Sequence, residues 1–119
     1  MSIKTAVTDL VDALNGAGID AAADPQDLTP PGVWVQLESV AHDLLSGDVT
    51  VRLRLYLVAG DTGTLNALDT LSTLLRRVLR IVDPNTDQDT TAESVYLPDN
   101  PSTPLPALRI NLDTLESLT

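Results

Sequence analysis

The sequence predicts an α+β domain: a mixed, mainly antiparallel sheet with a central hairpin, packed by an N-terminal helix and one long helix. Odd positions from Val49 to Leu57 are all aliphatic and alternate with polar or aromatic residues, which is the period of a half-buried strand. After a short AGDTG break, aliphatic residues recur every three or four positions from Leu68 to Val82, which is the period of an amphipathic helix. A strand that leads directly into a helix is therefore the expected centre of the fold.

The composition indicates a single domain, residues 1–119, with an aliphatic core. Phe is absent, and Trp34, Tyr56 and Tyr96 are the only aromatic residues, so Leu, Val, Ile and Ala must fill the core. The chain has no Cys and one His, which rules out a disulfide framework, a thiolate metal site and an imidazole cluster. We expect no cofactor and no metal.

The charge balance argues against tight binding of nucleic acid. Seventeen acidic side chains against seven basic ones give a formal charge of −10, which repels a phosphate backbone unless the arginines gather on one surface. The segment MSIKTAVTDLVDAL has acidic residues and no continuous apolar core, so we expect no signal peptide. No run approaches the roughly 20 apolar residues of a membrane span, so we expect no membrane association.

The N-terminal part predicts a helix, a short strand and a connector. Aliphatic residues share one helical face over residues 2–15, and Gly16 and Gly18 end this helix. Residues 19–23 fit a short edge strand. Residues 24–32 contain three prolines and form a turn-rich connector that does not join a central ladder.

Residues 33–59 predict an antiparallel hairpin with its turn near Leu45. Both strands have their apolar residues at odd positions. Two residues that face each other across the hairpin must therefore have numbers that add up to an even value, and a turn near Leu45 sets this sum to about 90. The register then pairs Trp34 with Tyr56, Gln36 with Arg54 and Glu38 with Arg52. If the numbers of the two facing residues add up to two more than this, Glu38 lies opposite Arg54 instead. Such an aromatic pair and such ion pairs stabilise a sheet by about 0.2–1 kcal/mol each.

The polar face of the hairpin has two compatible interpretations. Arg52 and Arg54 are either cross-strand partners on a solvated face or part of a functional surface. The tip of the hairpin has two adjacent leucines, Leu44 and Leu45, which either fold back over the core or protrude and dock into a partner. We assign no role to His42, because a single histidine is more often structural than a ligand.

The long helix is expected over residues 62–82, with Asp61 or Thr62 as its N-cap and the Asp83-Pro84 step as its end. Its last turns contain Arg76, Arg77 and Arg80, three of the seven basic residues. Cations near a helix C-terminus are favoured by the helix dipole. The other interpretation is an arginine patch that engages acidic residues of a neighbouring subunit.

The C-terminal part predicts two strands separated by a proline-rich segment. Residues 92–97 and 108–112 have short strand patterns. Residues 98–106 contain four of the eight prolines, which lack amide donors, so we expect a loop or arm and not a ladder strand. Residues 113–119 are expected to form a short acidic tail.

No catalytic pattern is visible in the sequence. A nucleophile with its base, a Gly-rich phosphate loop before a helix, paired carboxylates in a cleft and an HxxxH metal site would each leave a trace. The aspartates are instead scattered among caps, turns and exposed helix faces, and the glycines stand at element boundaries. We therefore expect a protein that is not an enzyme and works by shape and assembly.

This order of elements, in a small acidic chain without Cys, resembles the tail terminator (tail completion) proteins of long-tailed phages (siphoviruses), particularly those of actinobacterial hosts. The likeness covers nearly the whole chain as an order of elements, without an invariant motif. It is carried by the early helix 3–14 followed by GAGID, and by the segments PPGVWVQLESV, VTVRLRLYLVAGD, LNALDTLSTLLRRVLRIV, SVYLP and PALRINL.

The resemblance implies a structural protein of the virion whose mixed sheet is flanked by helices. In that family the subunits form a homo-hexameric ring on the finished tail tube. The ring stops polymerisation of the tail tube protein and presents the surface to which the head-tail connector (stopper) protein attaches. Viral DNA passes through the central channel without specific binding. The implied location is the tail-neck junction of the virion, after assembly in the host cytoplasm.

The ring that the resemblance implies requires two different faces of the subunit to meet. Besides the proline-rich segment, the candidate interface residues are Leu44, Leu45, Arg52, Arg54, Tyr56, Arg76, Arg77 and Arg80. An acidic channel wall repels DNA phosphates and lets the strand pass. The strand-face arginines depart from that simple picture, so either Glu38 neutralises them or their face points to a neighbouring subunit.

Two other functions remain open for this sequence. Another neck, connector or minor tail protein shares the same small α+β plan. An acidic protein-binding module, such as a DNA mimic that inhibits a host protein, should concentrate its carboxylates in a regular row on one face. The carboxylates of this chain are dispersed among caps and loops, which weighs against a mimic.

Overall fold

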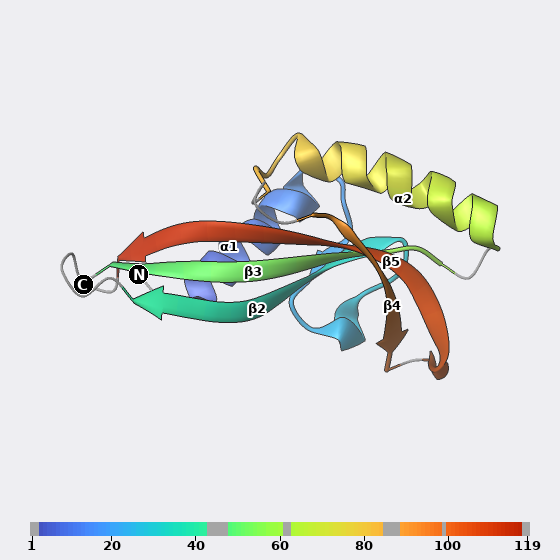
Figure 1. Cartoon of the computed structure of the whole chain (residues 1–119), viewed down its shortest axis with the longest axis horizontal. Helices are drawn as coiled ribbons and strands as arrows, with labels where there is room; N and C mark the ends of the chain where they lie inside the picture. The colour runs from blue at the N-terminus through green and yellow to red at the C-terminus, as the bar shows by residue number, and fades with distance from the viewer. Residues whose placement is uncertain (1–2, 43–47, 61–62, 85–88, 99, 118–119) are drawn as a thin grey trace.

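The computed structural model describes residues 3–42, 48–60, 63–84, 89–98 and 100–117. Their elements, in chain order, are α1 (Ile3–Gly16), β1 (Ala21–Ala22), the short 3-10 helix η1 (Pro25–Asp27), β2 (Gly32–His42), β3 (Asp48–Val58), α2 (Thr64–Leu79), β4 (Thr91–Leu97) and β5 (Asn100–Ser117). The strands form one sheet in the order β1-β2-β3-β5-β4 (Figure 1), in which only the β1–β2 pair is parallel. The predicted α+β fold with a mixed, mainly antiparallel sheet is confirmed.

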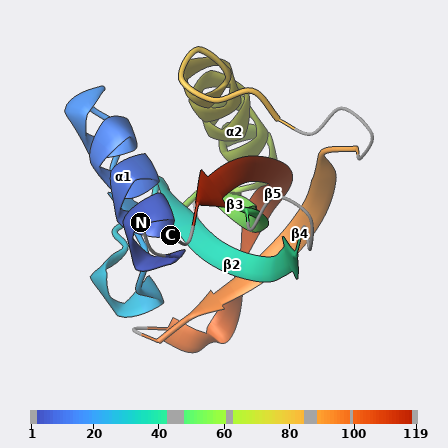
Figure 2. The same cartoon turned by 90° about the vertical axis from the view of Figure 1, so that its left-hand side faces the viewer.

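Both helices pack on the same face of the sheet, as predicted (Figure 2). The odd-numbered side chains of β3 lie beneath them and are almost fully buried. Burial of an aliphatic side chain of this size contributes about 1.5–3 kcal/mol, so this layer is the main source of stability. The core includes Leu14, Val33, Val35, Val51, Leu53, Leu55, Leu57, Leu71, Leu74, Val78 and Ile110.

The end of α1 is fixed by a Schellman motif. The amide of Ile19 donates to the carbonyl of Leu14 at 3.0 Å, and the amide of Gly18 donates to the carbonyl of Asn15 at 3.0 Å. Gly18 has a φ of 83°, a left-handed conformation that favours glycine. The side chain of Asn15 then exchanges two hydrogen bonds with the backbone of Ala21, which ties the helix to β1.

A smaller apolar cluster lies on the other face of the sheet, at one end only. It joins η1 and its connector to the curled β4–β5 hairpin, and its buried members are Ala22, Leu28, Val58, Val95, Leu97, Leu105 and Ala107. At the opposite end, β2, β3 and β5 extend together as a three-stranded arm (Figure 1). The molecule is consequently elongated, with extents of 50 × 27 × 26 Å.

The register of the hairpin is confirmed up to Leu37. The structure pairs Trp34 with Tyr56 and Gln36 with Arg54. Leu37 shares the side of β2 on which Val33 and Val35 are buried, yet it is 43% exposed. The reason is that β1 pairs only with Val33 and Trp34, so β2 is the edge of the sheet at Leu37.

A β-bulge changes the register beyond that point. It inserts an extra residue into β2 between Leu37 and Ser39, so that Ser39 and not Glu38 lies opposite Arg52. The predicted pairing of Glu38 with Arg52 is therefore wrong. The carboxylate of Glu38 instead lies 3.3 Å from the guanidinium of Arg54.

The long helix is shorter than predicted. It begins at Thr64 with Gly63 at the N-cap, and not at the predicted Asp61 or Thr62, which lie outside the described residues. It ends at Leu79, and the amides of Ile81 and Val82 bond back to the carbonyl of Val78 in a final turn. The chain thus leaves the helix before the Asp83-Pro84 step.

The proline-rich segment is part of β5 from Asn100 onward, so its prediction as a loop or arm is wrong there. The carbonyl of Pro106 accepts a hydrogen bond from the amide of Ala59 at 3.0 Å, on the side opposite β4. The N and C=O of one strand residue point to the same side, and residues two apart repeat that direction. The backbone nitrogens of Pro104 and Pro106, which carry no hydrogen, therefore point away from β4. The β4–β5 ladder loses no hydrogen bond to them and stays intact.

The predicted acidic tail is also wrong up to residue 117. β5 continues to Ser117. From Ala107 onward it pairs with the whole length of β3, from Val58 opposite Ala107 to Asp48 opposite Ser117. The second edge of β3 needs a partner, and the C-terminal segment supplies it. β3 becomes the central strand, hydrogen-bonded on both sides.

We predict that Gly32→Ala destabilises the fold by about 1–3 kcal/mol, the usual range for overpacking. A Cβ at residue 32 would meet the carbonyl oxygen of Asp20 and Cδ1 of Leu28, each at 2.8 Å. Gly16→Ala is the matched control, because a Cβ there meets nothing within 4 Å. Urea unfolding followed by circular dichroism measures both. Equal free energies of unfolding for the two variants would contradict the close packing at Gly32.

Candidate functional site

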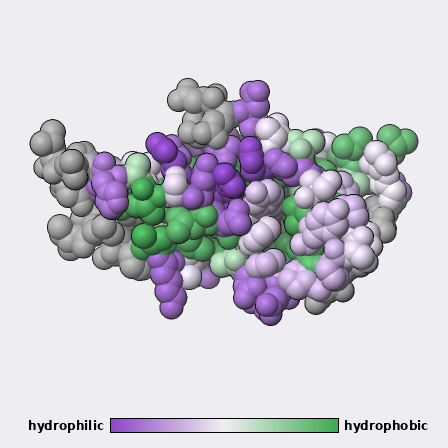
Figure 3. Space-filling model, turned by 60° about the horizontal axis from the view of Figure 1, so that its bottom comes forward, coloured by the Kyte–Doolittle hydropathy of each residue, from purple (hydrophilic) through white to green (hydrophobic). Residues whose placement is uncertain are grey.

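The face of the arm that the helices leave uncovered carries a set of polar and aromatic side chains. We call this the polar sheet face; it comprises Trp34, Glu38, Arg52, Arg54, Tyr56, Glu93, Arg109, Asn111 and Asp113. On β3 and β5 these residues alternate with buried aliphatic residues, so the period-two pattern places them together. Glu38 joins them from the bulge of β2, and Glu93 joins them from β4. Figure 3 brings the β2 side forward and shows hydrophilic surface across the middle of the molecule, with a hydrophobic patch in its left half.

Each arginine of the polar sheet face has a carboxylate beside or opposite it. Arg54 lies 3.3 Å from Glu38, and Arg109 lies 3.5 Å from Glu93. Arg52 lies opposite Asp113 in the β3–β5 register. The face is therefore charge-balanced, although the chain as a whole has a formal charge of −10.

Arg54 interacts with two other side chains of this face, those of Glu38 and Tyr56. Loss of hydration lowers its pKa, but the carboxylate of Glu38 and the side chain of Tyr56 raise it more, so the pKa of Arg54 lies above its ordinary value. Its Nε atom is buried and has no hydrogen-bond partner within the described residues. The guanidinium stays charged at every physiological pH.

Trp34 and Tyr56 form the aromatic part of the polar sheet face. Their rings are stacked, with centroids 5.2 Å apart and an interplanar angle of 28°. The Trp34 indole N–H donates to the carbonyl of Ala23 at 3.2 Å, which fixes the ring against the connector. The predicted aromatic pair is confirmed, and it closes the polar sheet face toward the smaller apolar cluster.

The structure brings together only some of the residues that the sequence singles out. Arg52, Arg54 and Tyr56 share the polar sheet face. Arg76, Arg77 and Arg80 lie at the end of α2, on the opposite side of the sheet. Leu44 and Leu45 lie outside the described residues, so neither of their two interpretations is tested.

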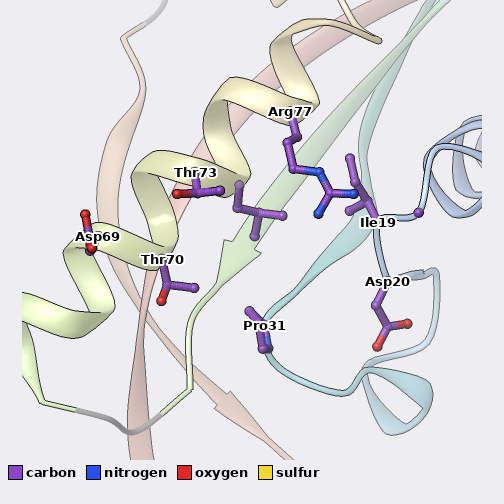
Figure 4. A pocket seen from close by; sticks show the side chains of 9 residues that line it. Ile19, Asp20, Pro31, Asp69, Thr70, Thr73 and Arg77 are labelled. Carbon is purple, nitrogen blue, oxygen red and sulfur yellow. The ribbon is translucent and has the colours of Figure 1, made fainter.

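Arg77 lies in a pocket between α2 and the turn that follows α1 (Figure 4). Its guanidinium donates to the carbonyl of Ala17 at 3.3 Å, which links the ends of the two helices. Figure 4 shows Asp20 across the opening from α2, where Asp69, Thr70 and Thr73 line the other wall. The pocket has a volume of about 360 Å³ and an apolar floor that includes Ile19 and Leu74. The role of Arg77 here is to join helices.

The two outer edges of the arm carry backbone groups that no described strand pairs. β1 pairs with β2 no further than Trp34, and β4 pairs with β5 no further than Arg109. Residues 35–42 of β2 and 110–117 of β5 therefore present free edges. Proteins commonly protect such edges with Pro, Lys or a β-bulge. Neither Pro nor Lys occurs in these two segments, and the β2 edge contains the bulge between Leu37 and Ser39.

The sequence patterns do not predict four of the nine residues of the polar sheet face, nor either of the free edges. Arg109 and Asn111 do alternate with aliphatic residues, which marks their strand. Nothing in that local pattern shows that β5 pairs with β3, because sheet order depends on long-range contacts. The partners Glu93 and Asp113 follow only from that order.

Comparison with protein-family models, with curated proteins and with solved structures finds no significant match to this chain. Within the described residues, no group of His, Cys, Asp or Glu side chains is arranged to hold a metal ion. Neither α1 nor α2, over the parts described, is long and apolar enough to span a membrane. What the geometry offers is a charge-balanced face between two free strand edges.

We predict that Glu38 and Arg54 are coupled weakly, by about 0.2–1 kcal/mol, because their side chains are 26% and 34% exposed. A double-mutant cycle of Glu38→Ala and Arg54→Ala, measured by urea unfolding, gives this energy, and high salt should reduce it. The Glu93–Arg109 pair is the matched comparison, with similar exposure. A coupling energy above about 2 kcal/mol that does not change with salt would contradict this prediction, because it would indicate a buried ion pair.

Proposed function

We propose that this protein is a ring-forming tail terminator of a long-tailed phage, which caps the tail tube, ends its polymerisation and provides the attachment surface for the head-tail connector. The observation that carries the proposal is the three-stranded arm with a free edge on each side. The resemblance in the order of elements supplies the biological setting.

The two free edges suit a head-to-tail contact between copies. β2 and β5 are both antiparallel to β3, so they run parallel to each other on opposite sides of the arm. Copies placed side by side around an axis would pair β5 of one subunit with β2 of the next in parallel. Such a contact joins two different faces, so it closes into a ring when the rotation between copies fits.

The number of strands fits a channel. Six copies of a three-stranded arm would contribute about 18 strands, and closed barrels of roughly 16–18 strands enclose an aqueous channel. The helices would lie outside, because α1 and α2 share one face of the sheet. The polar sheet face would then line the channel.

The paired charges of the polar sheet face suit the passage of DNA. Unpaired arginines on a channel wall would hold the phosphate backbone by releasing counterions. Here Glu38 and Glu93 neutralise Arg54 and Arg109 at 3.3 and 3.5 Å. A balanced wall in a negatively charged protein lets the strand slide without specific binding. The ring would act at the tail-neck junction of the virion, after assembly in the host cytoplasm.

The test is tube capping with a variant of the β2 edge. Purified tail tube protein is polymerised with and without this chain, and tube lengths and end caps are scored by electron microscopy. The wild type should shorten the tubes and cap one end. Leu37→Lys should abolish capping, because it sets a charge on a 43% exposed residue of the free edge without disturbing the core.

Leu65→Lys is the matched control, since Leu65 is 82% exposed and lies on α2, away from the arm. It should cap as the wild type does. Capping by Leu37→Lys at the wild-type level would overturn the edge contact. A wild-type protein that leaves tube growth unchanged under every condition would overturn the terminator function.

A further inference from the structure

We propose that α2 is a self-pairing surface, through which two copies of this chain associate by antiparallel helix packing about a two-fold axis. The surface lies on the exposed flank of α2, beside its buried face, where Leu68 also borders a pocket lined by Ser94, Pro104 and Pro106. Figure 1 shows α2 along one side of the molecule. It uses neither edge of the arm, so it is independent of the ring proposed above.

The exposed flank of α2 carries a second apolar stripe beside the buried one. The described large hydrophobic residues that are exposed include three on this helix: Leu65 at 82%, Leu68 at 52% and Leu79 at 44%. With the half-buried Leu75 and with Ser72 they follow the spacing 65, 68, 72, 75, 79, which is the a/d pattern of a two-helix seam. The core-facing residues Ala67, Leu71, Leu74 and Val78 form a separate stripe.

Ser72 stands at the middle of the stripe and suits a close crossing of two helices. Its side chain is small, and its hydroxyl donates to the carbonyl of Leu68 at 2.9 Å. A partner helix can therefore cover Ser72 without leaving its hydroxyl unpaired. Two copies that cross there in antiparallel orientation bring Leu65 and Leu68 of one against Leu79 and Leu75 of the other.

The charges beside the stripe select the antiparallel orientation and a second copy as the occupant. Asp69 and Arg76 both flank the stripe on the same side, seven residues apart, and both are exposed. Neither has an ion-pair partner within the part of the chain that the structure describes. In an antiparallel pair, same-side flanking positions face each other, so Asp69 meets the partner's Arg76 twice per dimer. A parallel pair would instead set Asp69 against Thr64 and Arg76 against the core-facing Leu71, with no opposite charge at either place.

The contact is expected to be weak. A helix of 16 residues is about 24 Å long, and a contact between two such helices falls below the roughly 1,200 Å² of a standard stable interface. Association should therefore appear only at high protein concentration. A weak two-fold contact suits reversible pairing of free subunits.

The test is sedimentation equilibrium of the full chain over a concentration series that reaches about 1 mM. Asp69→Arg and Arg76→Asp should each lower the self-association constant about tenfold, because each creates two like-charge contacts per dimer. An equimolar mixture of the two variants should associate at least as tightly as the wild type, because both contacts are then complementary. This rescue shows that the two positions face each other's charges across the contact.

Leu68→Lys should also abolish the association, and Leu37→Lys, on the arm, should leave it unchanged. Thermal unfolding by circular dichroism checks that each variant is folded. A wild type that stays monomeric up to about 1 mM overturns the proposal. So does association that the single charge swaps leave unchanged, or a mixture that fails to recover it. Loss of tube capping in Leu37→Lys with this pairing intact separates the two proposals.

Discussion

The alternation of side chains along β3 is the constraint on which the rest of the structure depends. Its odd-numbered residues from Val49 to Leu57 are nearly fully buried under the two helices, while Arg52, Arg54 and Tyr56 point to the opposite face. A shift of one residue would exchange the two faces, so burial of five aliphatic side chains fixes the register. β2 and β5 pair with both edges of this strand and take their own orientation from it.

The local patterns of the sequence predict the helices, the hairpin and the Trp34–Tyr56 pair, because periodicity and turn position are short-range properties. They fail at Glu38, where a bulge shifts the register, since a bulge leaves no mark in a pattern of period two. They also fail at Pro104 and Pro106, because tolerance of proline in a strand depends on which side its nitrogen faces. The pairing of Arg109 with Glu93 needs the sheet order, which no local window contains.

The same constraint leaves the surfaces on which the proposed assembly rests. With the helices on one face and β3 in the centre, the arm ends in two free edges and one charge-balanced face. The free edges offer backbone hydrogen bonds, which need no particular side chains, and this explains why no motif marks them in the sequence. The exposed stripe of α2 is a side-chain surface on the helix-covered face of the sheet, so the two proposed contacts would not compete.

Amide hydrogen exchange of the free and the assembled protein tests the role of the arm most directly. Residues 35–42 and 110–117 should gain protection on assembly, because their outward N–H groups find partners in the neighbouring subunit. Residues 48–55 of β3 should be protected in both states, because β3 is hydrogen-bonded on both sides. An assembled ring in which both edge segments exchange as fast as in the free chain would contradict the edge-to-edge contact.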